Sequence, residues 1–335
     1  MKKLYVLAGS LLLSSAAMAQ GHELFFSEYA EGAHASGTTY PGSTGPSTGN
    51  ERAIEIFNPT TSNVNLDPYS IRRYSNGSTT PSEEERLKKA TGANTIISSG
   101  TFVYANGEAT LLDIRNKADQ FTPGTYGTAG PNTMGTSGSV AYFNGDDAMA
   151  LVRWTGATAG QGTPVIVDIF GVIGNKPLHP SGNTSLTGFW RSREVVAPGD
   201  TIDVRSANQS LVRKPFIENG IRVNPAVASY RIGDEWIPYS DAFDTPNVGD
   251  QSYADLGQHT FTGTLGAYNT VASVLEKFNN SITVYPVPAK EVVNIKLENV
   301  KVSALTILNS IGQSISAVPA GFDNEIVQVN TSNLK

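Results

Sequence analysis

The chain contains no cysteine among its 335 residues, and charged residues make up only 16% of it. Without cysteine it forms no disulfides and carries no thiolate nucleophile or thiolate metal ligand. Its stability must come from burial, and a chain of this length with 39% hydrophobic residues can form a sizeable core. Beyond residue 20 it also lacks an uncharged apolar run of about 20 residues, the length that spans a bilayer.

The N-terminus has the pattern of a cleaved export signal. Lys2 and Lys3 precede an uncharged, mainly apolar stretch over Leu4–Leu13, and Ala17-Met18-Ala19 supplies the small residues of a cleavage site. A membrane anchor is the alternative interpretation, but the apolar stretch is too short to span a bilayer. We expect a signal peptide over residues 1–19, passage through the Sec translocon into the periplasm, and no transmembrane segment in the mature chain.

The charge balance disfavours one class of partner. The chain has 24 basic against 30 acidic residues, and removing Lys2 and Lys3 leaves 22 against 30, a net charge of about −8. Nucleic-acid binders need a basic face to neutralise phosphates. We therefore expect no nucleic acid among the partners.

Short runs of alternating polarity recur after the export signal, and each is rich in β-branched or aromatic residues. Turn-forming pairs such as Asn76-Gly77 and Asn106-Gly107 lie between them. The predicted strands are Leu24–Tyr29, Ala53–Asn58, Ser70–Tyr74, Thr101–Ala105, Ala148–Trp154, Val165–Val172 and Gln209–Lys214. The pattern predicts an all-β sandwich.

Two insertions interrupt this rhythm within a first domain that we place at residues 20–262. Gly32–Asn50 is almost wholly Gly, Ser, Thr, Ala and Pro, which predicts a mobile surface loop. Ser82 and Glu85 have the spacing of a capping box, which predicts a short helix ending near Ala90 or Gly92.

The composition changes after His259, where a stretch rich in Gly, Thr, Ser and Asn begins. We place a linker at residues 263–281. Strand-like runs resume in residues 282–335, which predicts a second, smaller β-domain.

Seven segments of the first domain carry a resemblance to a known family. In chain order they are Leu24–Tyr29, Ala53–Asn58, Val64–Gly77, Phe143–Leu151, Asp168–Gly174, Leu211–Lys214 and Leu256–Thr260. Together they resemble the bacterial lamin tail domain, and Phe143–Leu151 is the most distinctive match. The resemblance implies an immunoglobulin-like β-sandwich. It implies no particular ligand, since such sandwiches host unrelated functions.

The C-terminal stretch carries a second resemblance. Val284–Ala289 contains a Tyr-Pro-x-Pro opening, Leu308–Gln313 fits a central strand and glycine turn, and Thr331–Lys335 leads toward a further strand. These segments resemble the type A sorting domain of the type IX secretion system, a small β-sandwich. That family continues through a Gly-x-Tyr strand and a basic strand, so we expect the domain to be incomplete at Lys335. The chain is then a fragment, the interpretation we favour, or its secretion across the outer membrane is impaired.

Most catalytic patterns are missing from the sequence. The histidines are His22, His34, His179 and His259, and they have neither the i, i+4 spacing nor the His-Glu-x-x-His pattern of a zinc site. A Gly-x-Ser-x-Gly elbow, a Walker loop and a dinucleotide fingerprint are also absent. The sequence therefore favours a protein without catalytic residues or a bound cofactor.

Five oxygen-bearing residues form a candidate calcium site: Glu28, Glu55, Asn144, Asp146 and Asp147. Pairing of two early strands would bring the two glutamates together, with Glu55 pointing outward and Glu28 on the face of Phe26. The turn at positions 144–147 would approach the same end, and such ligands suit Ca²⁺. A hairpin turn that caps backbone amides is the simpler interpretation of that turn. Two carboxylates are also the minimum of a glycosidase.

Trp190 is the best candidate for ligand contact among the three tryptophans, because it lies in the loop Thr187–Arg191 and could stack on a sugar. Core packing is the alternative for all three, since aromatic side chains bury large areas.

These patterns lead to one functional hypothesis and two alternatives. We expect a secreted or outer-surface, non-catalytic binding or structural module, exported by Sec and then by the type IX machinery. Its partner would be an extracellular protein or a polysaccharide. The alternatives are an accessory or substrate-binding part of a secreted hydrolase and a carbohydrate-binding module.

Overall fold

The structure is a computed structural model that describes two parts of the chain. It covers residues 23–259 with gaps at 33, 185, 198–199, 216, 239–252 and 254, and it covers the strands of the C-terminal part. Tertiary contacts separate the unit Gln20–Leu265 from a unit that includes Gly266–Lys335. The predicted signal peptide and linker lie outside the described residues, so the proposed domain limits stay predictions.

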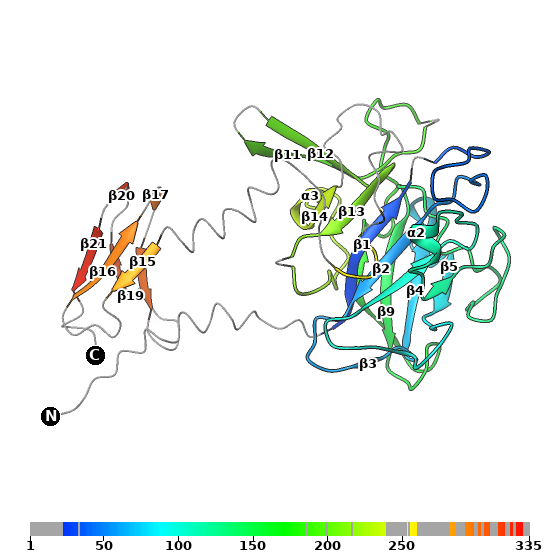
Figure 1. Cartoon of the computed structure of the whole chain (residues 1–335), viewed down its shortest axis with the longest axis horizontal. Coiled ribbons are helices and arrows are strands. Elements are labelled where there is room, and N and C mark those ends of the chain that lie inside the picture. Colours follow the sequence, from blue (N-terminus) through cyan, green and yellow to red (C-terminus); the bar gives the residue numbers. More distant parts are fainter. Residues whose placement is uncertain are drawn as a thin grey trace. The chain divides into compact units, whose positions relative to one another are not determined.

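Two sheets form the body of the first unit (Figure 1). The first has six strands in the order β14 (Trp236–Pro238), β13 (Gln209–Arg213), β1 (Phe25–Glu31), β2 (Ala53–Phe57), β7 (Thr101–Ala105) and β8 (Gln120–Phe121). The second has four strands in the order β10 (Pro164–Phe170), β9 (Ala148–Trp154), β4 (Tyr69–Tyr74) and β5 (Glu83–Arg86). Neighbours are antiparallel except β7 and β8, which are parallel. The all-β prediction is confirmed.

Shorter elements complete the first unit. Two further strand pairs are β3 (Val64–Asn65) with β6 (Thr95–Ile96), and β11 (Arg191–Ala197) with β12 (Asp200–Arg205). The helical turns are η1 (Ser75–Gly77), α2 (Leu112–Arg115) and α3 (Ile232–Glu235).

The core between the two sheets follows from the strand register. Leu211, Tyr29, Ile54 and Tyr104 are cross-strand neighbours on one face of the six-stranded sheet, and all are buried. Tyr29 stacks on Phe170 of β10, with 3.9 Å between ring centroids. Alternation along each strand therefore sends large apolar side chains toward the other sheet.

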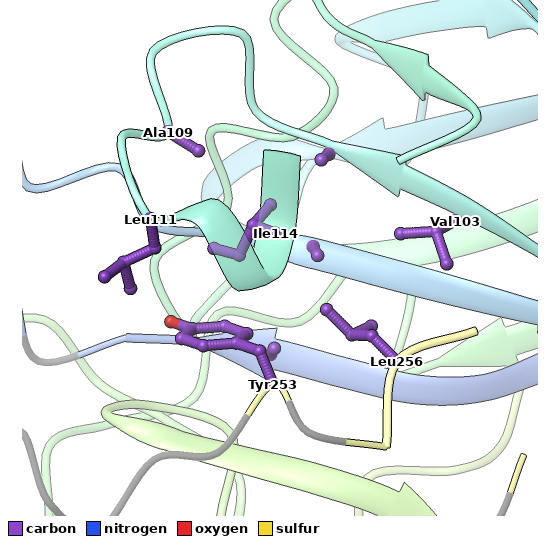
Figure 2. Close-up of a cluster of buried hydrophobic side chains, with 9 residues drawn as sticks. Val103, Ala109, Leu111, Ile114, Tyr253 and Leu256 are labelled. Carbon is purple, nitrogen blue, oxygen red and sulfur yellow. The ribbon is translucent and has the colours of Figure 1, made fainter. Parts of the chain in front are cut away.

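The opposite face of the six-stranded sheet is buried as well, which its sequence does not indicate. Ala30, Ala53 and Ala105 leave room on this face for Ile114 of α2, and Tyr253 and Leu256 pack into the same apolar cluster (Figure 2). The central strands are therefore covered on both sides, and β1 is buried along its length.

The predicted helix after Ser82 is wrong, because residues Glu83–Arg86 form β5. Glu83 and Glu84 lie opposite Arg73 and Arg72 of β4, and each pair forms an ion pair at 2.9 Å. Oppositely charged cross-strand neighbours stabilise a sheet. The capping-box spacing is overridden by these contacts with β4.

The insertion at Gly32–Asn50 is largely exposed, as expected of a surface loop, but it is tied down at several points. Gly37 N–H donates to the Ser47 carbonyl at 2.8 Å, and Thr44 N–H donates to the Thr110 carbonyl at 2.8 Å. The Ser47 hydroxyl donates to the Glu51 carboxylate at 2.9 Å. The insertion thus has a defined, hydrogen-bonded course despite its composition.

The C-terminal unit is also built from antiparallel strands. Its three-stranded sheet has the order β15 (Ile282–Tyr285), β16 (Val292–Leu297) and β21 (Ile326–Asn330). Two strand pairs accompany it, β17 (Lys301–Val302) with β20 (Phe322–Asp323), and β18 (Leu305–Leu308) with β19 (Ser314–Val318).

Candidate functional site

Glu28 and Glu55 lie side by side on the covered face of the six-stranded sheet. The register pairs Glu28 of β1 directly with Glu55 of β2, and Val212 and Val103 flank them on β13 and β7. A β-bulge between Phe26 and Glu28 shifts the register at this point. The structure thus brings together the two glutamates that the sequence suggested as neighbours.

The predicted orientations of these glutamates need correction. Both carboxylates are only 1% exposed, so Glu55 does not face solvent. The bulge changes the alternation along β1, which is why the face of Phe26 is a poor guide to that of Glu28. Tyr253, Leu256 and Gly257, together with α2, cover the face that the alternation of β2 assigned to solvent.

Glu55 is held by hydrogen bonds from two parts of the chain. The Ser27 hydroxyl donates to Oε1 at 2.6 Å, and the Gly257 N–H donates to Oε2 at 2.5 Å. The Gln258 N–H donates to the Asp255 carbonyl at 3.1 Å, so residues 255–258 form a turn. Gly257 and His259 have φ values of +89° and +46°, so the backbone enters the left-handed region at both positions.

Burial raises the pKa of both glutamates. The pKa of Glu55 rises from 4.5 to about 7, because burial outweighs the hydrogen bonds that favour the carboxylate. The pKa of Glu28 is raised well above 4.5 by burial, then by the negative charges of Glu55 and Asp255, while Lys117 lowers it. Glu28 Oε1 is buried without a hydrogen-bond partner among the described residues. Both carboxyl groups therefore keep their proton to a higher pH than a solvated glutamate does.

The turn residues of the predicted calcium site are engaged elsewhere. Asp147 binds Arg73 at 3.1 Å and accepts the Asn76 N–H at 2.9 Å, while Asp146 binds Lys176 at 3.4 Å. Asn144 is exposed. Asp147 accepts a backbone N–H, as the turn interpretation expected, but residues 122–147 contain no strand, so the turn does not close a hairpin.

The described residues contain no group of three or more acidic or histidine side chains placed to hold a metal ion. Glu28 and Glu55 instead lie on the sheet face covered by Tyr253 and Leu256, Asp146 and Asp147 are paired with Lys176 and Arg73, and Asn144 is exposed. The calcium site stays a prediction, and these contacts do not add to its support.

Trp190 is 7% exposed, which corrects the expectation of an exposed loop residue. It packs edge-on against Phe170 and Tyr230, with centroid separations of 6.3 and 6.0 Å. Gly171 lies directly against the indole, because a Cβ at that position would come within 2.6 Å of the ring. Trp190 precedes β11 and faces the core, so its side chain offers no open platform for a sugar.

Sequence reasoning missed Asp255 and Lys117. Asp255 is 1% exposed and acts on Glu28, and Lys117 Nζ donates to the Tyr253 carbonyl at 2.6 Å. The only sequence signal was the similarity of Leu256–Thr260 to a closing segment. That similarity did not indicate that the segment contacts β1 and β2. Gly257 bonds Glu55 although the two residues are 202 positions apart in the sequence.

Comparison with known proteins identifies the C-terminal part. Residues 283–335 match the secretion system C-terminal sorting domain family. Neither the curated proteins nor the solved structures gave a match to the chain. The predicted type IX sorting domain is therefore confirmed, and it marks the chain as a secreted or cell-surface protein that engages the type IX machinery. Among the described helices, none has the length and hydropathy of a membrane span.

Proposed function

We propose that this chain is a secreted or cell-surface protein whose body, residues 20–262, binds or scaffolds without catalysing a reaction. Residues 1–19 act in this proposal as the Sec signal peptide that delivers the chain to the periplasm. The sorting domain at residues 283–335 supports the second export step. The partner is an extracellular protein or polysaccharide.

We infer that the body has a lamin-tail-like, immunoglobulin-like fold. The segments that carry this resemblance make contacts that hold the sheets together. Phe143 packs on Tyr29 at 4.6 Å, and Asp147 bonds Arg73 and the Asn76 amide. These residues therefore have structural roles. Such roles are expected of segments shared by a family whose members have a common fold but no common activity.

The burial of Glu28 and Glu55 is the observation that supports a non-catalytic role. A glycosidase or metal-dependent hydrolase must present its carboxylates to a substrate in a cleft. Here both carboxylates are buried within the same chain, and Glu55 accepts a hydrogen bond from the Gly257 N–H. This arrangement favours a structural use of the pair over hydrolysis.

The test is a hydrolysis assay on the purified full chain. Phosphomonoester, phosphodiester and glycoside substrates would be offered with and without Mg²⁺, Mn²⁺ or Ca²⁺, and we expect no turnover above buffer. Metal-dependent turnover that disappears in Glu28→Gln or Glu55→Gln would contradict the proposal. Asp113→Asn, which alters an exposed carboxylate of α2, is the matched control.

Carbohydrate binding is a second candidate, favoured by one groove. A cavity of about 240 Å³ lies between residues 81–84 and 134–137. Its polar lining consists of Ser82, Glu83, Glu84, Thr136 and Ser137. Hydroxyls and carboxylates of this kind can donate to and accept from the hydroxyls of a sugar. The volume suits one sugar ring.

An exposed aromatic ring stands close to this groove. Tyr126 is 63% exposed and packs edge-on against Tyr142 at 5.2 Å. Arg73 connects it to the groove, because this guanidinium bonds Glu83 at 2.9 Å and donates at 3.0 Å to the carbonyl of Tyr142, the residue on which Tyr126 packs. Tyr126 is therefore a better stacking candidate than the buried Trp190.

Affinity electrophoresis would test this second candidate with soluble β-glucan, xylan and mannan in the gel. We expect retardation by at least one polysaccharide and its loss in Tyr126→Ala. Ile97→Ala alters an equally exposed apolar residue and serves as the control. Absence of retardation, or retardation that survives Tyr126→Ala, would remove carbohydrate binding at this groove.

A further inference from the structure

Two loops of the body have the same backbone conformation. The first loop comprises residues 36–48 and the second loop residues 126–138, so counterparts lie 90 positions apart. The succession of turn, extended, bridged and bent residues is the same at every position of the two loops. Identical residues occupy five positions, which in the first loop are Gly37, Thr38, Pro41, Gly45 and Ser47. The two loops are therefore two examples of one local structure.

Matching backbone hydrogen bonds hold the two loops in place. The Ser43 N–H donates to the carbonyl three residues before it at 3.1 Å, and the Thr133 N–H does so at 3.2 Å. The following N–H of each loop donates at 2.8 Å to a neighbouring segment of the body. Ser43 forms an antiparallel bridge with Leu111, and Thr133 forms one with Glu85. Each loop is thus fixed against the rest of the body in the same way.

Both loops lie at the same end of the six-stranded sheet. Ala53 at the start of β2, Ala105 at the end of β7 and Phe121 at the end of β8 are cross-strand neighbours. The first loop leads into β2, and the second loop follows β8. Ala53 and Phe121 lie two strand spacings apart, which is about 10 Å.

The turn after β7 contacts the chain next to both loops. Glu108 accepts a hydrogen bond from the Asn50 side chain at 2.6 Å, just after the first loop. Gly107 lies against Gly124, just before the second loop, because a Cβ on Gly107 would come within 2.9 Å of Gly124. The two loops therefore flank one turn and form neighbouring parts of one surface.

This surface is uncharged and rich in hydroxyl groups. Neither loop contains a charged residue, and hydroxyl side chains occupy eight positions of the first loop and five of the second. Thr38, Thr39 and Thr128 are among the exposed ones. Such groups can both donate to and accept from the hydroxyls of a sugar. A highly charged ligand would find no complementary charge on either loop.

A polysaccharide fits this surface better than a protein does. Protein interfaces bury a core enriched in aromatic residues, methionine and arginine. Within the two loops, all of whose residues the structure describes, Tyr126 is the one large apolar side chain that is strongly exposed. The occurrence of one local structure twice favours a ligand that repeats, since each loop can bind a unit of the same chain.

We propose that the first and second loops are two equivalent binding elements for an uncharged polysaccharide, which contacts both of them along one chain. The proposal rests on the carbohydrate-binding candidate described above and extends it. The groove between residues 81–84 and 134–137 belongs to the second loop, and the first loop supplies a second contact. The counterpart of Tyr126 is Ser36, so an aromatic ring strengthens the second loop alone.

Affinity electrophoresis with matched variants of the full chain tests the pairing. Thr39→Glu and Ala129→Glu place a charge at counterpart positions, both of them exposed. Thr61→Glu is the control, because Thr61 is exposed and lies beyond the end of β2 that is far from the first loop. The gels would contain soluble β-glucan, xylan or mannan at a series of concentrations, and the retardation gives Kd.

Both loop variants should weaken binding. Contact at two linked sites commonly exceeds the affinity of either site by about 10²–10⁴, so losing one loop should raise Kd at least about tenfold. Ala129→Glu should have the larger effect, because the second loop carries Tyr126. Thr61→Glu should leave Kd unchanged.

Competition on the wild type adds a measurement that does not depend on the variants. A free monosaccharide occupies one loop at a time. Per sugar unit it should therefore compete at least about tenfold more weakly than the polysaccharide from which it comes. Equal competition per sugar unit would overturn binding at two linked loops.

The outcomes separate this inference from the carbohydrate-binding candidate itself. An unchanged Kd in Thr39→Glu together with a raised Kd in Ala129→Glu would overturn the role of the first loop and leave binding at the groove intact. Retardation by none of the three polysaccharides would overturn both. Circular dichroism checks that each variant folds, and the competition measurement decides the question for a variant that does not.

Discussion

Arg213 of β13 and Asp168 of β10 form an ion pair that joins the two sheets of the body. Both side chains are fully buried. Asp168 also accepts hydrogen bonds from the backbone N–H of Phe26 at 2.8 Å and from that of Ile221 at 2.7 Å. Arg213 forms a second ion pair, with Glu235. One carboxylate thereby fixes β1, β10, β13 and the loop before α3.

Loss of one member of this pair should be strongly destabilising. Asp168→Ala leaves the Arg213 guanidinium buried without its main partner, and such changes cost about 3–5 kcal/mol of unfolding free energy. Chemical denaturation would measure the loss. Asp67→Ala, at a half-exposed carboxylate, should cost less than about 1 kcal/mol and is the control. Equal losses in the two variants would show that the buried pair has no special role.

Removing either of two buried tyrosine hydroxyls should change the stability of the protein in opposite directions. Tyr29 Oη has no hydrogen-bond partner among the described residues, whereas Tyr104 Oη donates to Glu85. Tyr29→Phe should leave stability unchanged or raise it by up to about 1 kcal/mol, and Tyr104→Phe should lower it by about 1–3 kcal/mol. Thermal or urea unfolding compares them. A larger loss in Tyr29→Phe would reveal a partner for that hydroxyl.

Two features of Gly171 disfavour a side chain, its positive φ and its contact with the Trp190 ring. Gly92 has only the first of them, so comparing the two positions separates their costs. The φ of Gly171 is +86° and a Cβ would lie 2.6 Å from the Trp190 ring, whereas Gly92 has a φ of +76° with open space around it. Gly92→Ala should cost about 1–2 kcal/mol from backbone strain alone. Gly171→Ala should cost clearly more, in denaturant unfolding. Equal costs would mean that Trp190 moves aside freely.

Glu85 should make global stability depend on pH. Burial raises its pKa from 4.5 to about 7, so the folded state binds this proton more tightly than the unfolded state. The stabilisation from this tighter proton binding is fully present below about pH 4.5 and is lost as pH rises to 7. At about 1.4 kcal/mol per pKa unit, the loss in unfolding free energy is up to about 3 kcal/mol. Urea unfolding at pH 5 and 7.5 should show a smaller difference in Glu85→Gln than in the wild type. An equal difference would exclude Glu85 as a source.

Calcium should have no effect on thermal unfolding. Asp147 is already paired with Arg73 and Asp146 with Lys176, so the turn carries little unbalanced negative charge. A cation that binds only the folded state raises the melting temperature with concentration. We expect the same melting temperature with EDTA and with millimolar Ca²⁺. A rise with Ca²⁺ that is lost in Asp146→Asn would establish the predicted site.

Strand positions were the most predictable feature of this chain. β4 and β7 fall on runs whose alternation and β-branched or aromatic content indicate strands. The prediction was wrong for Glu83–Arg86, because the acidic run resembles the first turn of a helix. Its partners, Arg72 and Arg73, are cross-strand neighbours whose pairing the local sequence does not reveal.

The candidate site was predictable only as a pair of neighbouring carboxylates. Pairing of β1 with β2 brings Glu28 next to Glu55, as the early position of both strands suggested. Their burial depends on a bulge and on residues 255–259, where Gly257 contacts Glu55 of β2 from 202 positions away. Contacts of such sequence separation leave no periodic signal in either segment, so the cover over the glutamates was not foreseeable.

β5 is the last strand of the four-stranded sheet, and residues 132–134 pair with its outer edge. Arg86 N–H donates to the Asn132 carbonyl and Met134 N–H donates to the Glu84 carbonyl, so residues 132–134 lie along this edge like a short fifth strand. An unpaired edge is a template for strands of other molecules. By occupying its own edge over these residues, the chain makes this stretch of β5 unavailable for pairing with a strand of another molecule.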